Sequence, residues 1–179
     1  MKIVVVKNPT KDQKKEIKKL QKLTFTEVDN QEVEEDFYHQ PSVQVLAYIN
    51  DKLVGWAGVY ETKQEYEGRK VFIGGYGICT HPSYQRRGIA SQVSMKAMDY
   101  LKKQGIDVAF LSVDPTNEAS IKLHKKNGFA MLSKKFSWTD SNGVIKEDNG
   151  GMVASVGSKK LFDYVIKGEE SFYVGNGYW

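Results

Sequence analysis

The alternation of apolar and polar positions gives the clearest structural signal in the first half of the chain. Apolar residues recur at every second position from Val43 to Ile49, and residues 53–60 form a second apolar run that would return beside the first. The Asn50-Asp51 pair between the two runs favours a tight turn. We therefore predict a β-hairpin here, because a period of two is typical of half-buried strands.

Helical spacing appears in other stretches, each next to a residue that can cap a helix. Thr10 and Gln13 match a capping box ahead of apolar residues three positions apart, and Gln104-Gly105 and Gly168 are typical helix ends. The acidic stretch at residues 29–36 predicts a loop leading into a short second helix. We expect strands at residues 1–6, 43–49, 53–60, 71–80, 107–113, 129–138 and 152–156. Residues 61–70 are expected to be a charged connection between two of these strands. We expect helices to begin after Thr10, near residues 37–38, and at Gly88, Asn117 and Ser158.

The expected strand beginning at Val71 contains Gly74, Gly75 and Gly77. Glycine weakens the interior of a strand, so three of them need a reason. They indicate either a ligand lying against the backbone or tight packing under an aromatic side chain, and both explanations stay open.

This strand leads through a Pro-Ser turn into a helix whose first residues form an anion site. The first N–H groups of a helix have no partner inside it, and the helix dipole favours negative charge there. Gly88 allows close approach of the backbone, and arginine donors suit phosphate oxygens. The loop residues concerned are Gln85, Arg86, Arg87, Gly88, Ile89, Ala90 and Ser91.

Composition narrows the class of protein. The 26 basic and 22 acidic side chains leave a net charge of +4, which is too small for a dedicated nucleic-acid binder. The single Cys79 excludes an intramolecular disulfide and a cysteine-rich zinc site. No apolar run approaches the roughly 20 residues of a membrane span, and the N-terminus does not resemble a signal peptide. We expect one cytoplasmic domain, residues 1–179, with no metal, no nucleic-acid partner and no membrane association.

A second motif lies after the strand expected at residues 107–113. Asn117 begins the pattern, Ser120 and His124 continue it, and Gly128-Phe129 closes it. Together with the Gln-x-x-Gly-x-Ala order of the loop, this chain resembles the GNAT superfamily of acetyltransferases over about residues 40–137. The resemblance implies a mixed α/β fold: a twisted, mostly antiparallel sheet with a splayed parallel pair of central strands, flanked by helices.

The resemblance also implies acetyl-coenzyme A as cosubstrate and assigns its contacts. The pyrophosphate of the coenzyme would bind the glycine loop. The pantetheine arm would bind backbone groups around Ile78 and Thr80 on one side, and Asn117 and Ser120 would hold it from the other side. A backbone N–H near Cys79 would polarise the thioester carbonyl. The Cys79 thiol itself is better explained as a small core residue than as a nucleophile.

Two positions depart from the family pattern. His124 stands where the family usually has a tyrosine that protonates the leaving thiolate, and an imidazole with a pKa near 6.5 can act as an acid at neutral pH. The alternative is that His124 only packs beside the sulfur, since a thiol of pKa about 8.5 leaves well without an acid. Tyr76 stands where some relatives carry a glutamate base; a phenol is a poor base, so we expect it to line the acceptor pocket.

The C-terminal tail, ending at Trp179, resembles that of aminoglycoside 2′-N-acetyltransferases, although an apolar tail docked on the domain is the slightly better explanation. We expect a helix and tail at residues 158–179 docked on the domain. The Trp179 carboxylate with Asp29 and Glu35 would form an acidic acceptor pocket. The leading function is acetyl transfer to a primary amine of a small cationic substrate such as an amino-sugar or polyamine. A peptide or protein amine and a catalytically silent acyl-coenzyme A sensor are the alternatives, and the expected assembly is a monomer or homodimer.

Overall fold

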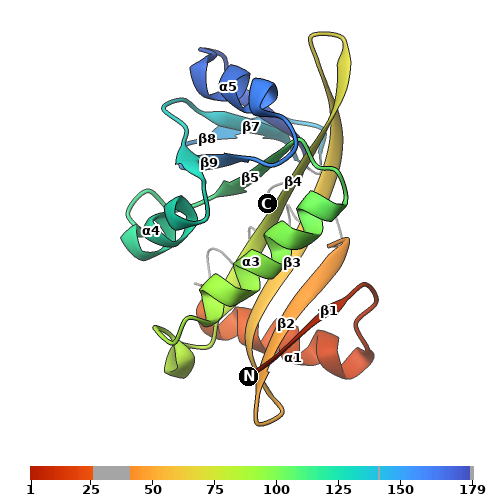
Figure 1. The fold of residues 1–179 in the computed structure, drawn as a ribbon, viewed down its shortest axis with the longest axis vertical. Helices are drawn as coiled ribbons and strands as arrows, with labels where there is room; N and C mark the ends of the chain where they lie inside the picture. Colours follow the sequence, from red (N-terminus) through yellow and green to blue (C-terminus); the bar gives the residue numbers. More distant parts are fainter. Residues whose placement is uncertain (26–40, 141, 178–179) are drawn as a thin grey trace.

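The structure is a computed structural model that describes residues 1–25, 41–140 and 142–177 (Figure 1). Its helices are α1 (Lys11–Thr24), the 3-10 turn η1 (Pro82–Tyr84), α3 (Ile89–Lys103), α4 (Glu118–Lys126) and α5 (Lys159–Lys167). Its strands are β1 (Lys2–Val6), β2 (Val43–Ile49), β3 (Lys52–Tyr66), β4 (Arg69–Thr80), β5 (Val108–Ser112), β6 (Ala130–Met131), β7 (Phe136–Thr139), β8 (Ile145–Asp148), β9 (Gly151–Ser155) and β10 (Phe172–Asn176). The second helix expected near residues 37–38 lies outside the described residues.

The strands form two sheets. The larger has the order β1-β2-β3-β4-β5-β9-β6, and the smaller has the order β10-β7-β8. Only the pairs β4–β5 and β10–β7 are parallel among the described strands, and the other neighbours are antiparallel. The predicted mixed α/β fold, with a mostly antiparallel sheet and a parallel central pair, is therefore confirmed.

Helices α3 and α1 cover opposite faces of the central strands. On one face Val93, Ala97 and Leu101 of α3 are fully buried against the sheet, and the long helix crosses β3 and β4 in Figure 1. On the other face Ile17 and Leu20 of α1 pack in a separate apolar cluster. Successive side chains of a strand point to opposite faces. The side chains of β4 therefore alternate between the face covered by α3 and the opposite face.

The capping box predicted at the start of α1 is present. Thr10 Oγ1 accepts a hydrogen bond from the Gln13 N–H at 3.2 Å, and Gln13 Oε1 accepts one from the Thr10 N–H at 2.9 Å. The reciprocal bonds satisfy two donors that the helix itself cannot.

The smaller sheet and α5 cover the rest of the face that α1 occupies. Leu161 and Val165 of α5 and Phe172 of β10 are buried in a cluster rich in aromatic rings. Phe110 of β5 lies at its centre, with ring centroids 4.9 Å from Phe136 and 5.8 Å from Phe172. The C-terminal segment is thus built into the core up to β10.

The prediction of a charged connection at residues 61–70 was wrong, because most of these residues are strand. The hairpin of β3 and β4 continues to the pair Tyr66↔Arg69, and the turn is made by Glu67 and Gly68, both at positive φ. Opposite charges face each other across the strands in the pair Glu65↔Lys70, a pairing that stabilises an antiparallel ladder. A run of charged residues that suggested a loop is therefore an exposed strand pair.

The single strand predicted at residues 129–138 is two strands in different sheets. β6 pairs with β9 only as far as Met131, because Gly150 at φ +85° turns the chain just before β9 begins. After Leu132 the chain has no further partner there, and it enters the smaller sheet as β7. Strands β8 and β10 were not predicted from the sequence.

Candidate active site

The centre of the site is the point where β4 and β5 separate. The two strands pair only at Ile73↔Val108, Gly74↔Ala109 and Gly75↔Phe110, whereas β4 runs on to Thr80 and stays paired with β3 throughout. The last five residues of β4 therefore turn one backbone edge toward β5 without ladder bonds to it. Backbone groups in that state need a partner, which an extended amide-containing ligand provides. The predicted splay is confirmed.

Gly74 explains part of the glycine run. A Cβ at Gly74 would lie 2.4 Å from Leu101 Cδ2, so close helix packing excludes any side chain there. A Cβ at Gly77 would lie 3.7 Å from the Trp56 ring, which is ordinary contact. Tight packing thus accounts for Gly74, while Gly77 lies in the splayed part of β4, where a ligand is expected.

The glycine loop after β4 carries the geometry of an anion site. Gly88 is the N-terminal cap of α3 at φ +76°, Arg86 also lies at positive φ (+59°), and among the described residues no side chain caps this helix. A Cβ on Gly88 would meet no atom within 4 Å, so this side of the loop is open. Left-handed residues in such a turn direct consecutive N–H groups to one side, where an anion can bind.

The residues predicted to hold the pantetheine arm lie in the splayed part of β4 and at the start of α4. Ile78 is partly buried against the α3-side core. Thr80 Oγ1 is buried and has no hydrogen-bond partner within residues 1–25, 41–140 and 142–177. Asn117 caps α4 by accepting from the Ser120 N–H at 3.0 Å, which leaves its amide nitrogen as a donor. An orphaned buried hydroxyl beside an unpaired strand edge fits a ligand that supplies the missing bonds.

Tyr76 and His124 meet in the core below the splay. Tyr76 Oη lies 3.2 Å from His124 Nδ1, and each side chain is only 2 % exposed. Phe129 packs edge-on against both rings. Nearby, Asn127 Nδ2 donates to Ser94 Oγ at 2.7 Å and ties the end of α4 to α3. The sequence placed Tyr76 and His124 in one site, but it did not indicate that they bond to each other.

Burial determines the protonation of these groups. It lowers the pKa of His124 from 6.5 to about 4, so the imidazole is neutral at pH 7. Burial also raises the pKa of the Tyr76 phenol well above its usual value, despite opposing hydrogen bonds from Asn127 and Ser94. Both side chains are uncharged in the native protein at neutral pH.

Cys79 lies on the other face of β4, under α1. It is 4 % exposed, and burial raises the pKa of its thiol to about 12. A neutral buried thiol is a poor nucleophile, which agrees with the expectation that Cys79 is a core residue. Beside it, the Trp56 ring lies over Gly58 and Gly77, and its Nε1–H donates to Gln44 Oε1. Packing under an aromatic side chain was one of the two explanations left open for the glycines of β4, and for Gly77 the ring concerned is that of Trp56.

The predicted acceptor residues Asp29, Glu35 and Trp179 lie outside the described residues, so their roles stay predictions. No cluster of three or more metal-ligating side chains occurs in the part of the chain that the structure describes. Likewise, none of the described helices has the length and apolar character needed to cross a membrane.

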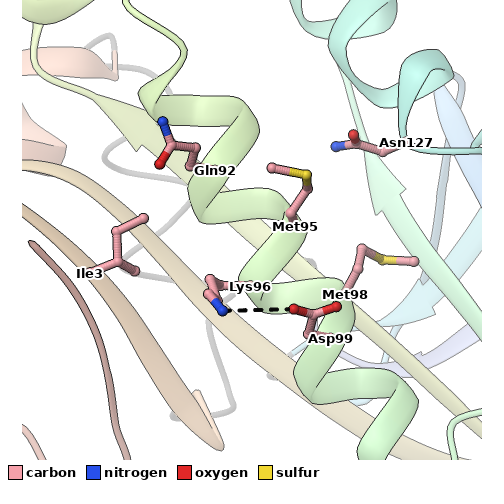
Figure 2. A pocket seen from close by; sticks show the side chains of 7 residues that line it. All are labelled: Ile3, Gln92, Met95, Lys96, Met98, Asp99 and Asn127. Carbon is pink, nitrogen blue, oxygen red and sulfur yellow. Dashed lines mark ion pairs between the residues drawn. The ribbon is translucent and has the colours of Figure 1, made fainter. Parts of the chain in front are cut away.

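A hollow of about 360 Å³ lies along α3 beyond the loop (Figure 2). Its lining includes Gln92 in the first turns of α3 and Asn127 at the end of α4. Figure 2 shows Met95 and Met98 on the side of α3 that faces Asn127. Nothing in the sequence pattern indicated it, because the lining comes from segments far apart in the chain.

The model of the acetyltransferase (GNAT) family matches residues 14–129, and this chain belongs to that family. Two animal relatives are similar over 122 residues, 68 % of this chain. One is the probable N-acetyltransferase san of Drosophila melanogaster, 31 % identical over 65 % of its own length; the other is the N-alpha-acetyltransferase 50 of Danio rerio, 28 % identical over 71 % of its length. A mycothiol acetyltransferase of Acidimicrobium ferrooxidans is 28 % identical over 55 % of this chain and 31 % of its own length. The chain thus spans less than two thirds of two of these relatives.

Solved structures agree on the fold. Naa20 of Chaetomium thermophilum, solved with a bisubstrate analogue, is 12 % identical and superposes with a TM-score of 0.64 over 98 % of this chain and 97 % of its own. The ribosomal-protein-S18-alanine N-acetyltransferase of Escherichia coli is 16 % identical, with a TM-score of 0.56 over 87 % of this chain and 94 % of its own. At these identities the likeness concerns the fold alone.

Proposed function

We propose that this protein transfers the acetyl group of acetyl-coenzyme A to a primary amine. One observation carries the proposal: β4 continues five residues past its last pair with β5 and then enters an uncapped glycine loop at the start of α3. The unpaired strand edge fits an amide-rich arm, and the loop fits the pyrophosphate attached to it. Family membership and the names of the relatives agree with this assignment.

The chain contributes binding and orientation more than reactive side chains. The cosubstrate supplies an activated thioester. The Gln85–Ser91 loop holds its phosphates through N–H groups, and the free edge of β4 fixes the arm. A backbone N–H near Cys79 stabilises the negative charge that develops on the carbonyl oxygen. Transfer is direct, because the buried Cys79 thiol is neutral and forms no acyl-enzyme.

His124 acts in this proposal as a positioning residue. With a pKa of about 4, its charged acidic form is scarce at pH 7, and the thiolate leaves without needing it. The 3.2 Å contact with Tyr76 Oη links α4 to the splayed part of β4. His124 therefore sets the spacing between Asn117 on α4 and the strand edge that faces it.

The proton of the amine goes to solvent rather than to Tyr76. The raised pKa of Tyr76 makes its phenolate unavailable near neutral pH. An amine that arrives partly deprotonated, or loses its proton through water, meets this requirement.

The proposal that the acceptor is a small cation depends on carboxylates that are predicted to lie near the C-terminal tail. They are Asp29 and Glu35, and Trp179 is predicted to lie beside them. A pocket of this kind selects ammonium groups by charge. Asp29→Asn and Glu35→Gln are expected to raise the KM for such an amine and to leave the affinity for coenzyme A unchanged.

The α-amine of a peptide is the second candidate. The side chains of Trp56 and Cys79 beside the unpaired part of β4 are apolar and buried, and neither carries a charge that would attract a polycation. One of the relatives is an N-alpha-acetyltransferase by name.

Acetyl-coenzyme A turnover with a panel of amines tests the proposal. The panel holds a polyamine, an aminoglycoside, and one peptide with its N-terminus free or already acetylated. Turnover with the polyamine or aminoglycoside supports the first candidate, and turnover that needs a free peptide N-terminus supports the second. If coenzyme A binds but no amine is acetylated, the result supports a catalytically silent acyl-coenzyme A sensor. If coenzyme A does not bind, both the acetyltransferase and the sensor hypotheses are contradicted.

A further inference from the structure

Four donors from three separate parts of the chain converge beside the glycine loop. Tyr84 of η1 is the centre: Lys52 Nζ lies 5.3 Å and Arg87 Cζ 5.1 Å from its ring centroid, and the His81 ring meets it edge-on at 5.4 Å. Lys52 begins β3, whereas Arg87 belongs to the loop. The fold, not sequence proximity, brings Lys52 to this ring.

The charge of Lys19 on α1 also acts on this cluster. Burial lowers the pKa of His81 most, and the positive charges of Lys52 and Lys19 lower it further. His81 Nδ1 accepts a hydrogen bond from the Ser83 N–H at 3.2 Å, so the neutral ring carries its proton on Nε2 and donates from there. The cluster thus offers two ammonium groups, a guanidinium and an imidazole N–H.

These charges have no counterion in the described part of the chain. None of the ion pairs found there involves Lys19, Lys52 or Arg87. Like charges held around one ring repel each other, and an anion between them removes the repulsion. Ammonium and guanidinium groups together are the side chains that bind phosphate most strongly.

We propose that Lys19, Lys52, His81 and Arg87 around Tyr84 form a second phosphate subsite, separate from the N–H groups of the glycine loop. The inference rests on the proposed function, and its ligand is a phosphate monoester. The 3′-phosphate of coenzyme A is the expected source. The adenosine that carries this phosphate also carries the pyrophosphate, which binds the adjacent glycine loop. Tethering makes the second contact effectively intramolecular. A phosphate borne by a second molecule, such as a phosphorylated acceptor, has the same chemistry.

Calorimetry with coenzyme A and with 3′-dephospho-coenzyme A tests the subsite. The wild-type protein is expected to prefer coenzyme A by about tenfold or more. The variants Lys52→Gln and Lys19→Gln lower this preference to about threefold or less, and high salt weakens it in the wild type. Lys63→Gln is the matched control, since Lys63 Nζ also lies over an aromatic ring, 5.5 Å from the Phe72 centroid, in a different hairpin position. The control keeps the wild-type preference.

A second arm separates the two sources of phosphate. The coenzyme-saturated protein is titrated with phenyl phosphate, and binding that Lys52→Gln weakens and Lys63→Gln does not would assign the subsite to a second molecule. If the wild type prefers coenzyme A and both lysine variants keep that preference, the cluster is not the subsite. Equal binding of both coenzymes together with no phenyl phosphate binding overturns the inference as well. Failure of both coenzymes to bind would instead contradict the proposed function.

Discussion

Replacing His124 by asparagine tests how this buried imidazole acts. Asparagine places an amide nitrogen or oxygen near the position of Nδ1, so contact with Tyr76 Oη stays within reach, but the group no longer titrates. The pKa of His124 falls from 6.5 to about 4 on folding. The neutral ring is favoured in the native state, and its stabilising effect is complete above pH 6.5.

The sign follows from proton binding. Between pH 6.5 and 4 the unfolded chain binds a proton at this site and the native protein does not, so acid stabilises the unfolded state. One pKa unit corresponds to about 1.4 kcal/mol, and the shift of His124 therefore costs the wild type about 3 kcal/mol by pH 4. The variant loses none of this, although the smaller side chain costs about 1–2 kcal/mol at pH 7.

Urea denaturation followed by tryptophan fluorescence, repeated from pH 7.5 to 4, measures the effect. The wild type is expected to be more stable than His124→Asn at pH 7, to lose this advantage as the pH falls through the window, and to be the less stable protein by about 1–2 kcal/mol at pH 4. Phe129→Leu is the control, because it perturbs the same ring cluster and removes no titrating group. If the wild-type and His124→Asn curves stay parallel over the whole range, His124 is not a buried neutral residue and the positioning role loses its basis.

Three further predictions concern the strand and the loop. Gly88→Ala should lower coenzyme A affinity by about tenfold or more in a folded protein, because its Cβ would point into the open side of the loop at φ +76°; unchanged calorimetric affinity would contradict the loop assignment. Thr80→Val should leave the free protein as stable as before or slightly more so, since its buried Oγ1 has no partner in the described structure, and should weaken coenzyme binding; loss of thermal stability without loss of affinity would argue for a structural hydroxyl. Gly74→Ala should destabilise by about 1–3 kcal/mol against Leu101, whereas Gly77→Ala should be nearly neutral; equal melting temperatures for the two variants would be inconsistent with the packing described.

Local chemistry was enough to predict the elements that depend only on neighbouring residues. The caps at Thr10 and Asn117 are built from side chains within a few positions of the backbone groups they satisfy, and the Asn50-Asp51 turn depends on two adjacent residues that tolerate positive φ. The glycine loop is of the same kind, since Gly88 and the free N–H groups after it belong to one turn. Their order along the chain, with Asn117 and Phe129 at the right distances, was sufficient to indicate the family.

Only the tertiary structure determined how the strands pair and which distant side chains meet. β10 pairs with β7, 36 residues earlier in the case of Phe172↔Phe136, and β6 ends where β9 stops offering an edge. No local pattern encodes these partners, because a strand shows the same alternation whatever lies beside it. The Tyr76–His124 contact and the approach of Lys52 to Tyr84 have the same origin: each depends on the register and the helix packing that place distant side chains a few ångströms apart.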